Sequence, residues 1–248
     1  MLPSVGPMCR WKSVLLVSLL ATTCAVSGCS DSSTGDDTQV MTGAELAGLL
    51  LSPGDIQGEW TLNKGPEGGG LPESGEITDA DRDQLPQVQV CDKASAAAKE
   101  AISNLRWQAY RQLDRTENDP LDPPKDREGH MEFVQQYLMS DEPSRITTLY
   151  GDAAPGFIEC LGDIPAGEEG PGTSTEVQIG QVGDERVAVL SRFEEAGGTG
   201  MWNIYSVLVR KGAVLVSVTA VDIVMGDLEA ELTLSDVSDI VETAVSKL

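Results

Sequence analysis

The stretch ERVAVLSRFEEAGGTGMWNIYSVLVRKGAVLVSVTAVDIV, residues 185–224, decides the fold. It contains three apolar runs rich in β-branched residues, 185–193, 201–210 and 213–224, joined by the connections EEAGGTG and KG. A fourth run, TEVQIGQ at 175–181, precedes them across VGD. Short glycine-containing connections between such runs are typical of β-hairpins, whose neighbouring strands are antiparallel. We therefore predict a four-stranded antiparallel meander.

Apolar residues at helical spacing predict three helices around this meander. The first, residues 44–51, follows TGAE, a capping-box sequence. The second spans 94–105, directly after a cysteine, and the third runs to Leu248 with Ser235 as its N-cap.

Two further strands are predicted at 106–114 and 130–140, where aromatic and apolar residues alternate. Residues 144–161 read as a helix that turns at Pro155, and the glycine- and proline-rich segments 63–76 and 162–174 read as loops. This order predicts an α+β domain: a single antiparallel β-sheet of about five to six strands, flanked by helices, with the C-terminal helix packed on the sheet.

The first 28 residues are typical of a bacterial lipoprotein signal peptide. Arg10 and Lys12 precede an apolar run that is too short for a membrane span and ends in VSGC. We expect cleavage before Cys29 and acylation of its thiol, which anchors the chain in the cell membrane on the extracytoplasmic face. The alternative is a plain secreted protein in which Cys29 only happens to lie near the cut.

The predicted organisation is therefore a signal peptide at 1–28, a disordered acidic tether at 29–41 and one domain at 42–248. Removing the signal leaves 15 basic against 40 acidic side chains, a net charge of −25. Such acidity excludes the basic footprint of a nucleic-acid-binding protein. It also leaves membrane attachment to the lipid, because an acidic chain is not drawn to anionic headgroups.

Cys91 and Cys160 are the two cysteines that remain once Cys29 is lipidated. Outside the cytoplasm, two cysteines in one domain most simply form a disulfide. A catalytic or metal-binding thiol is the competing interpretation, but with one histidine in the chain a Cys2His2 zinc site is impossible.

The sequence contains no motif that meets the requirements of a known catalytic, cofactor-binding or metal-binding site. DADRDQL, residues 79–85, places acids like the first ligands of a calcium loop, but it lacks the glycine and the final glutamate. GGTGMW lies between two predicted strands, whereas a phosphate-binding glycine loop opens a helix. No G-x-S-x-G or H-E-x-x-H sequence occurs. We expect no enzyme activity, no cofactor and no metal.

Four residues are candidates for ligand binding: Trp107, Tyr110, His130 and Tyr205. His130 shares a strand face with Glu132, so it is either an exposed residue at a strand start or a pH-responsive group. The aromatic residues either pack in the core or line a cleft.

The chain resembles the PknH-like extracellular sensor domains, which also occur in free actinobacterial lipoproteins. The resemblance rests on LAGLLLSPGDIQGEW at 46–60, the helix after Cys91, GFIECLGD at 156–163, the meander from Glu176 to Val224 and the terminal VETAVSKL. It implies a central antiparallel sheet flanked by helices, with a cleft for an extracellular ligand. Kinase-linked members have two disulfides, whereas this chain offers one cysteine pair and neither a kinase domain nor a transmembrane helix.

These observations predict a non-catalytic, membrane-anchored lipoprotein with a sensor or ligand-binding domain. Its partners are the membrane, through the lipid, and an unknown extracellular small molecule or protein. A lipid or lipoglycan carrier is the alternative and should contain a large dry cavity, whereas a sensor should have a shallower polar cleft. A hydrolase would need a nucleophile, a base and an orienting group in one pocket.

Overall fold

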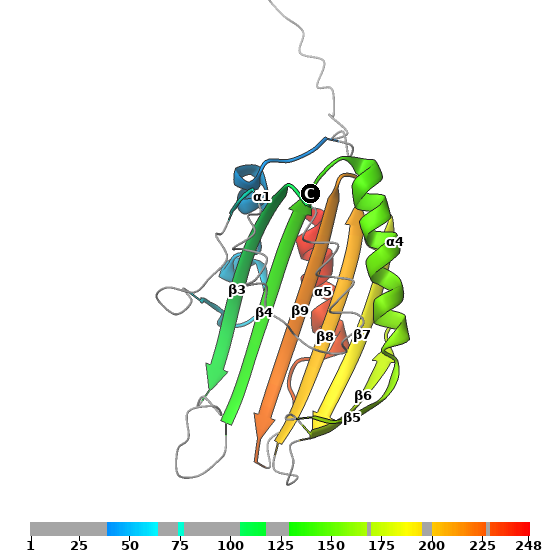
Figure 1. Ribbon diagram of the computed structural model, residues 1–248. Coiled ribbons are helices and arrows are strands. Elements are labelled where there is room, and N and C mark those ends of the chain that lie inside the picture. The colour runs from blue at the N-terminus through cyan, green and yellow to red at the C-terminus, as the bar shows by residue number, and fades with distance from the viewer. Residues whose placement is uncertain are drawn as a thin grey trace, which may run out of the picture. The chain divides into compact units, whose positions relative to one another are not determined.

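A single antiparallel sheet forms the centre of the molecule (Figure 1). The computed structural model describes residues 39–63, 74–76, 105–117, 129–167, 170–194, 200–226 and 229–248. The strand order is β1-β3-β4-β9-β8-β7-β6-β5, and β2 pairs with β3. The strands are β1 (Thr61–Leu62), β2 (Ser74–Glu76), β3 (Trp107–Glu117), β4 (Gly129–Ser140), β5 (Gly162–Gly167), β6 (Gly170–Glu176), β7 (Glu185–Glu194), β8 (Gly200–Lys211) and β9 (Val214–Met225). The α+β class is confirmed, but these nine strands exceed the five to six predicted.

The predicted hairpins β7–β8 and β8–β9 form as antiparallel neighbours. The tighter of the two pairs Lys211 with Val214, so Gly212 and Ala213 make the turn. Gly212 has φ 56°, a left-handed conformation that suits glycine. Its N–H donates to Asp184 Oδ2 at 2.9 Å, which ties the turn to the start of β7.

Helices cover both faces of the sheet (Figure 1). The long helix α4 (Pro143–Glu159) packs on β7, β8 and β9. The C-terminal helix α5 (Leu234–Ser246) packs on β8 and β9, as predicted, and shares its apolar cluster with α1 (Gly43–Leu49). A short 3-10 turn, η1 (Pro53–Asp55), follows α1 on this second face.

Alternation along the strands supplies apolar side chains to both faces of the sheet: one cluster lies on the α5 face, and two lie on the α4 face, the second of them around Ile204 and Val221. Val209, Val216 and Val241 are fully buried in the cluster beneath α5, whereas Tyr137 and Leu215 belong to the cluster beneath α4. Each fully buried aliphatic side chain of this kind stabilises the fold by about 1.5–3 kcal/mol.

Two segments predicted as loops contain strands at the margins of the sheet. The segment 63–76 contributes β2, and 162–174 contributes β5 and most of β6. Edge strands such as β2 and β5 tolerate glycine and proline, and Pro171 of β6 lies at the register shift in its pairing with β5, so a composition typical of loops did not prevent pairing here. The strand predicted at 175–181 begins and ends earlier in the structure. β6 spans Gly170–Glu176, and residues 177–180 lie outside the sheet.

Helix boundaries differ from the prediction at three places, the first being α1, which ends at Leu49 instead of residue 51. α4 continues through Pro155, whose ring deprives the carbonyl of Gly151 of its helical hydrogen bond; Gly151 is exposed, so water can take that place. α5 begins after Thr233 instead of Ser235, because Thr233 and Asp236 form a reciprocal capping box. The predicted helix at 94–105 and the sequence at 79–85 lie outside the described residues, except for Leu105.

Candidate functional site

A band of polar side chains crosses the α5 face of the sheet near one end. The strand register places Arg115 opposite Glu132, Glu132 opposite Asp222, Asp222 opposite Asn203, and Asn203 opposite Arg192. Residues that are directly opposite on paired strands share a face. Glu132 and Asp222 are 1% and 0% exposed, so two acids lie deep within an otherwise apolar layer.

His130 joins this band from β4. Its Nε2 lies 2.9 Å from Asp222 Oδ1 and 3.7 Å from Glu132 Oε1, and its Nδ1 lies 3.9 Å from Glu231 Oε1. The histidine is 7% exposed, so the prediction of an exposed strand-start residue was wrong. The segment leading into α5 lies over it, and that cover could not be seen from the strand pattern.

One carboxylate oxygen of Glu132 and one of Asp222 accept hydrogen bonds from neighbouring groups. Arg115 Nε donates to Glu132 Oε2, and the Leu232 N–H donates to Asp222 Oδ2 at 2.9 Å. Arg115 also forms an ion pair with Glu231, 3.3 Å from Nη2 to Oε2. Glu132 Oε1 has no hydrogen-bond partner among the described residues, and burial raises the pKa of this carboxyl, an effect that Arg115 partly offsets.

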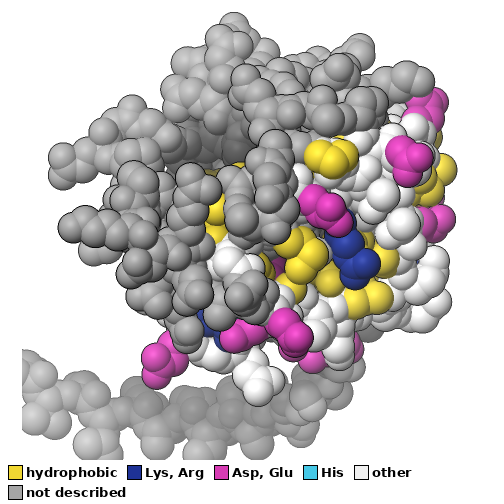
Figure 2. All heavy atoms as spheres, turned by 90° about the horizontal axis from the view of Figure 1, so that it is seen from below, with side chains coloured by type: hydrophobic (Ala, Val, Ile, Leu, Met, Phe, Trp, Pro, Cys, Tyr) yellow, Lys and Arg dark blue, Asp and Glu magenta, His cyan; other side chains and the backbone are white. Residues whose placement is uncertain are grey.

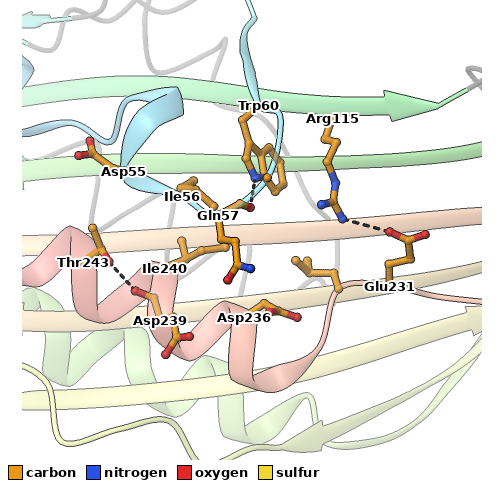
Figure 3. Close-up of a pocket in the computed structure, with 12 residues that line it drawn as sticks. Asp55, Ile56, Gln57, Trp60, Arg115, Glu231, Asp236, Asp239, Ile240 and Thr243 are labelled. Carbon is orange, nitrogen blue, oxygen red and sulfur yellow. Dashed lines mark hydrogen bonds and ion pairs between the residues drawn. The ribbon is translucent and has the colours of Figure 1, made fainter.

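A pocket of about 340 Å³ opens above this buried band (Figure 3). Figure 3 shows Trp60 and the η1 segment on one side, α5 on the other, and Arg115 with Glu231 at one end. Trp60 forms an aromatic wall, held by its indole N–H, which donates to the Gln57 carbonyl at 2.9 Å. The Arg115 guanidinium lies 5.5 Å from the centre of the Trp60 ring. The pocket is lined by Asp55, Ile56, Gln57, Gly58, Trp60, Arg115, Glu231, Leu232, Asp236, Asp239, Ile240 and Thr243.

Four carboxylates line the pocket, and three of them have a structural partner. Lys247 donates to Asp55 and, with Ser52, lowers its pKa to about 2. Asp236 accepts from the backbone of Thr233 at the start of α5, and Glu231 pairs with Arg115. Asp239 is exposed, and its carboxylate has no hydrogen bond or ion pair among the described residues, so it is available to a ligand.

Acidic side chains are also exposed on the end of the molecule that Figure 2 shows. Figure 2, which looks at the sheet from below, shows acidic side chains in magenta around exposed hydrophobic and basic side chains on the described part of that face. This surface agrees with the net charge of −23 for the whole chain. An acidic surface attracts cations and positively charged ligands and repels anionic ones.

The structure brings together two of the four predicted ligand-binding residues. Tyr205 joins the His130 site, because its hydroxyl donates to the Leu232 carbonyl at 3.4 Å while the N–H of Leu232 bonds to Asp222. Trp107 pairs with Ser140 at the other end of the sheet, and Tyr110 lies on the opposite face. Tyr110 stacks on Tyr137 with ring centres 4.6 Å apart, and burial raises its pKa to about 12.

The residues that complete the site were missed in the sequence. Asp222 is the acid within the apolar run 213–224, and a single charge inside a buried strand was the signal that could have revealed it. Arg115 lies just beyond the strand predicted at 106–114. Glu231 and Asp239 carried no distinct signal in the sequence, because acidic residues near a helix N-terminus are common for structural reasons alone.

Of the three cysteines expected in the mature chain, the structure describes Cys160. Cys160 follows the last residue of α4 and is disulfide-bonded. Cys29 and Cys91 are not among the described residues, so the pairing of Cys91 with Cys160 stays a prediction. None of the described helices is both long and apolar enough to cross a membrane.

No protein-family model matches the sequence, and no curated protein matches it either. The fold is similar to the crystal structure of the extracellular domain of PknH from Mycobacterium tuberculosis, with a TM-score of 0.51. The two chains are 13% identical, and the match covers 85% of this chain and 98% of the PknH domain. The PknH-like fold expected from the sequence is therefore confirmed.

Proposed function

We propose that this protein is a non-catalytic, extracytoplasmic binding lipoprotein, anchored at Cys29, whose acidic pocket binds a small polar ligand. The likeness to an extracellular domain supports the location, and the sequence VSGC supports the anchor. The observation that carries the binding function is the pocket beside α5, which combines an aromatic wall with carboxylates.

The ligand class follows from this lining. Pockets near 300 Å³ accommodate small molecules, and convergent polar groups fix the orientation of what they bind. Trp60 and Arg115 offer stacking surfaces, while Asp239 and Glu231 accept hydrogen bonds or attract a positive charge. A cationic or polyhydroxylated molecule fits these groups, whereas burying an acyl chain against several carboxylates is unfavourable. The carrier alternative therefore receives no support from this pocket.

A hydrolase function also lacks support. His130 and Asp222 could act as a base and its orienting group, but no described Ser, Thr or Cys forms a hydrogen bond with His130. The pair is buried below the pocket and does not line it.

The experiment is mass spectrometry of the small molecules that co-purify with the natively expressed protein. It compares the wild type with Asp239→Lys, which places a cation in the pocket, and with Asp152→Lys, a matched charge reversal on the exposed side of α4. We expect a polar compound with the wild type and Asp152→Lys, and its loss with Asp239→Lys. Equal recovery from all three proteins, or from none, contradicts the proposal, and a bound acyl lipid would favour the carrier.

A further inference from the structure

We propose that His130, Glu132 and Asp222 bind one divalent transition-metal ion beneath the ligand pocket. One donor atom from each residue lies within 4.8 Å of the other two, and all three residues are buried. Four-coordinate zinc with bonds near 2.0–2.2 Å holds its ligand atoms about 3.4 Å apart. The separations of 2.9 and 3.7 Å from His130 Nε2 to the two carboxylates lie on either side of that value.

The surrounding contacts orient both carboxylates toward the same point. Arg115 holds Glu132 by Oε2, and the Leu232 N–H holds Asp222 by Oδ2, which leaves Oε1 and Oδ1 facing His130 Nε2. Outer-shell hydrogen bonds of this kind fix metal-binding carboxylates in proteins. Glu231 lies on the side of the other ring nitrogen at 3.9 Å, which is beyond hydrogen-bond distance, so it faces the ring without a direct bond to it.

Glu132 Oε1 is the independent observation that points to a ligand. The residue is 99% buried, and this oxygen has no hydrogen-bond donor among the described residues. Buried polar atoms are nearly always satisfied, so an orphaned carboxylate oxygen that faces a histidine and a second carboxylate needs an explanation. A divalent cation would satisfy it and would balance the two negative charges.

The donors select the class of metal. One imidazole nitrogen with two carboxylate oxygens suits zinc and its first-row neighbours, whereas calcium takes six to eight oxygen ligands. The ion would link β4 to β9, and because the site has three protein ligands, the fourth position of a tetrahedral ion would be left to water. Binding of the ion does not require a ligand in the pocket.

The test uses the full chain in detergent, purified without a histidine tag and stripped with a chelator, then titrated with Zn²⁺. We expect one zinc per chain by elemental analysis and a melting temperature that rises with free Zn²⁺. Because His130 is the only histidine in the sequence, its imidazole signals in NMR report on the site without ambiguity. Zinc should shift the Nε2 resonance in the wild type, a readout that needs no variant.

Variants separate this site from the acidic surface. Asp222→Asn should weaken zinc binding at least about 100-fold, and Arg115→Gln, which removes the contact that orients Glu132, about 10–100-fold. Asp152→Asn, the same change at an exposed carboxylate on α4, should bind zinc like the wild type. An unchanged His130 signal at saturating Zn²⁺ overturns the proposal, and so does wild-type affinity in a folded Asp222→Asn protein, because the ion would then be held by surface acids.

Discussion

Asp222 on β9 lies directly opposite Glu132 on β4, so two buried acids face each other across the pairing of these strands. Like charges in that position oppose folding unless a counter-charge accompanies them. Arg115 supplies one on the β3 side, and His130 lies between the acids and Glu231. This end of the sheet is therefore held by charge pairing, whereas the rest of the same face is held by apolar packing.

Removing the arginine should cost substantial stability. In chelator, Arg115→Ala leaves the buried Glu132 carboxylate without its guanidinium, and we expect a loss of about 3 kcal/mol in the free energy of unfolding by urea denaturation. Adding Glu132→Gln should restore part of that loss, because the uncompensated charge is gone. Arg106→Ala, at an exposed arginine over Trp107, is the control and should cost less than about 1 kcal/mol. Equal losses at the two arginines would contradict the buried pairing.

The ion pair between Asp55 and Lys247 should make the fold sensitive to acid. The pKa of Asp55 falls from 3.8 to about 2 in the folded protein, chiefly through Lys247, so the unfolded chain takes up its proton first as the pH drops. The contribution of Asp55 is therefore present above pH 3.8 and is lost as the pH falls toward 2. Melting temperatures between pH 5 and 2 should fall less steeply for Asp55→Asn than for the wild type. Asp152→Asn should keep the wild-type slope; if Asp55→Asn keeps it too, the pair does not act in solution.

Two residues compete as the N-cap of α5: Thr233, which caps the helix in the structure, and Ser235, which was predicted from the sequence. Thr233→Ala removes the side chain that caps the helix and should destabilise the protein by about 1 kcal/mol. Ser235→Ala, at the cap predicted from the sequence, should change the free energy of unfolding by only a few tenths. Urea denaturation of the two variants measures both, and the reverse order would place the helix start at Ser235.

The bridge of Cys160 to Cys91 can be tested by thiol counting. The unfolded, unreduced mature protein should show neither thiol open to alkylation, and peptide mapping should join the two cysteines. Because such a bridge closes a loop of about 69 residues, the double variant Cys91→Ser with Cys160→Ser should lose roughly 4 kcal/mol of stability. Two freely alkylated thiols would rule the pairing out.

The anchor should depend on a single sulfur atom. Cys29→Ser removes the site of acylation, so we expect the protein to leave the membrane fraction on cell fractionation. Cys160→Ser, which leaves the lipoprotein signal intact, should stay with the membrane. Retention of Cys29→Ser in the membrane would end the lipoprotein hypothesis.

Local patterns in the sequence predicted the elements whose partners are close along the chain. The hairpins of β7, β8 and β9 and the helix ending at Ser246 follow from alternation and helical spacing, and both are confirmed. Strands β5 and β6 were missed because their glycines and prolines are tolerated at a sheet edge or at a register shift, positions that only the whole fold defines.

The site was predicted only in part, because its residues are brought together by the whole fold and not by local patterns. His130 and Tyr205 stood out by residue type, but their link to Asp222 requires the register of β4 on β9 and the path of the chain over Leu232. His130 and Asp222 are 92 positions apart in the sequence. Sequence periodicity carries no information about a contact at that separation. The sequence therefore could not show that, among the ligand-binding candidates, His130 belongs to the site whereas Trp107 and Tyr110 do not.

The pairing of β4 with β9 also sets an order of events for a chain that emerges N-terminus first. When β3 and β4 have appeared, one edge of β4 has no neighbour until Val214 to Met225 follow. An open edge with apolar neighbours is a site of faulty association, and non-local pairing slows its closure. The sheet is therefore completed only when β9 has emerged, and a stall in synthesis before Val214 leaves a half-built sheet that is open to other chains.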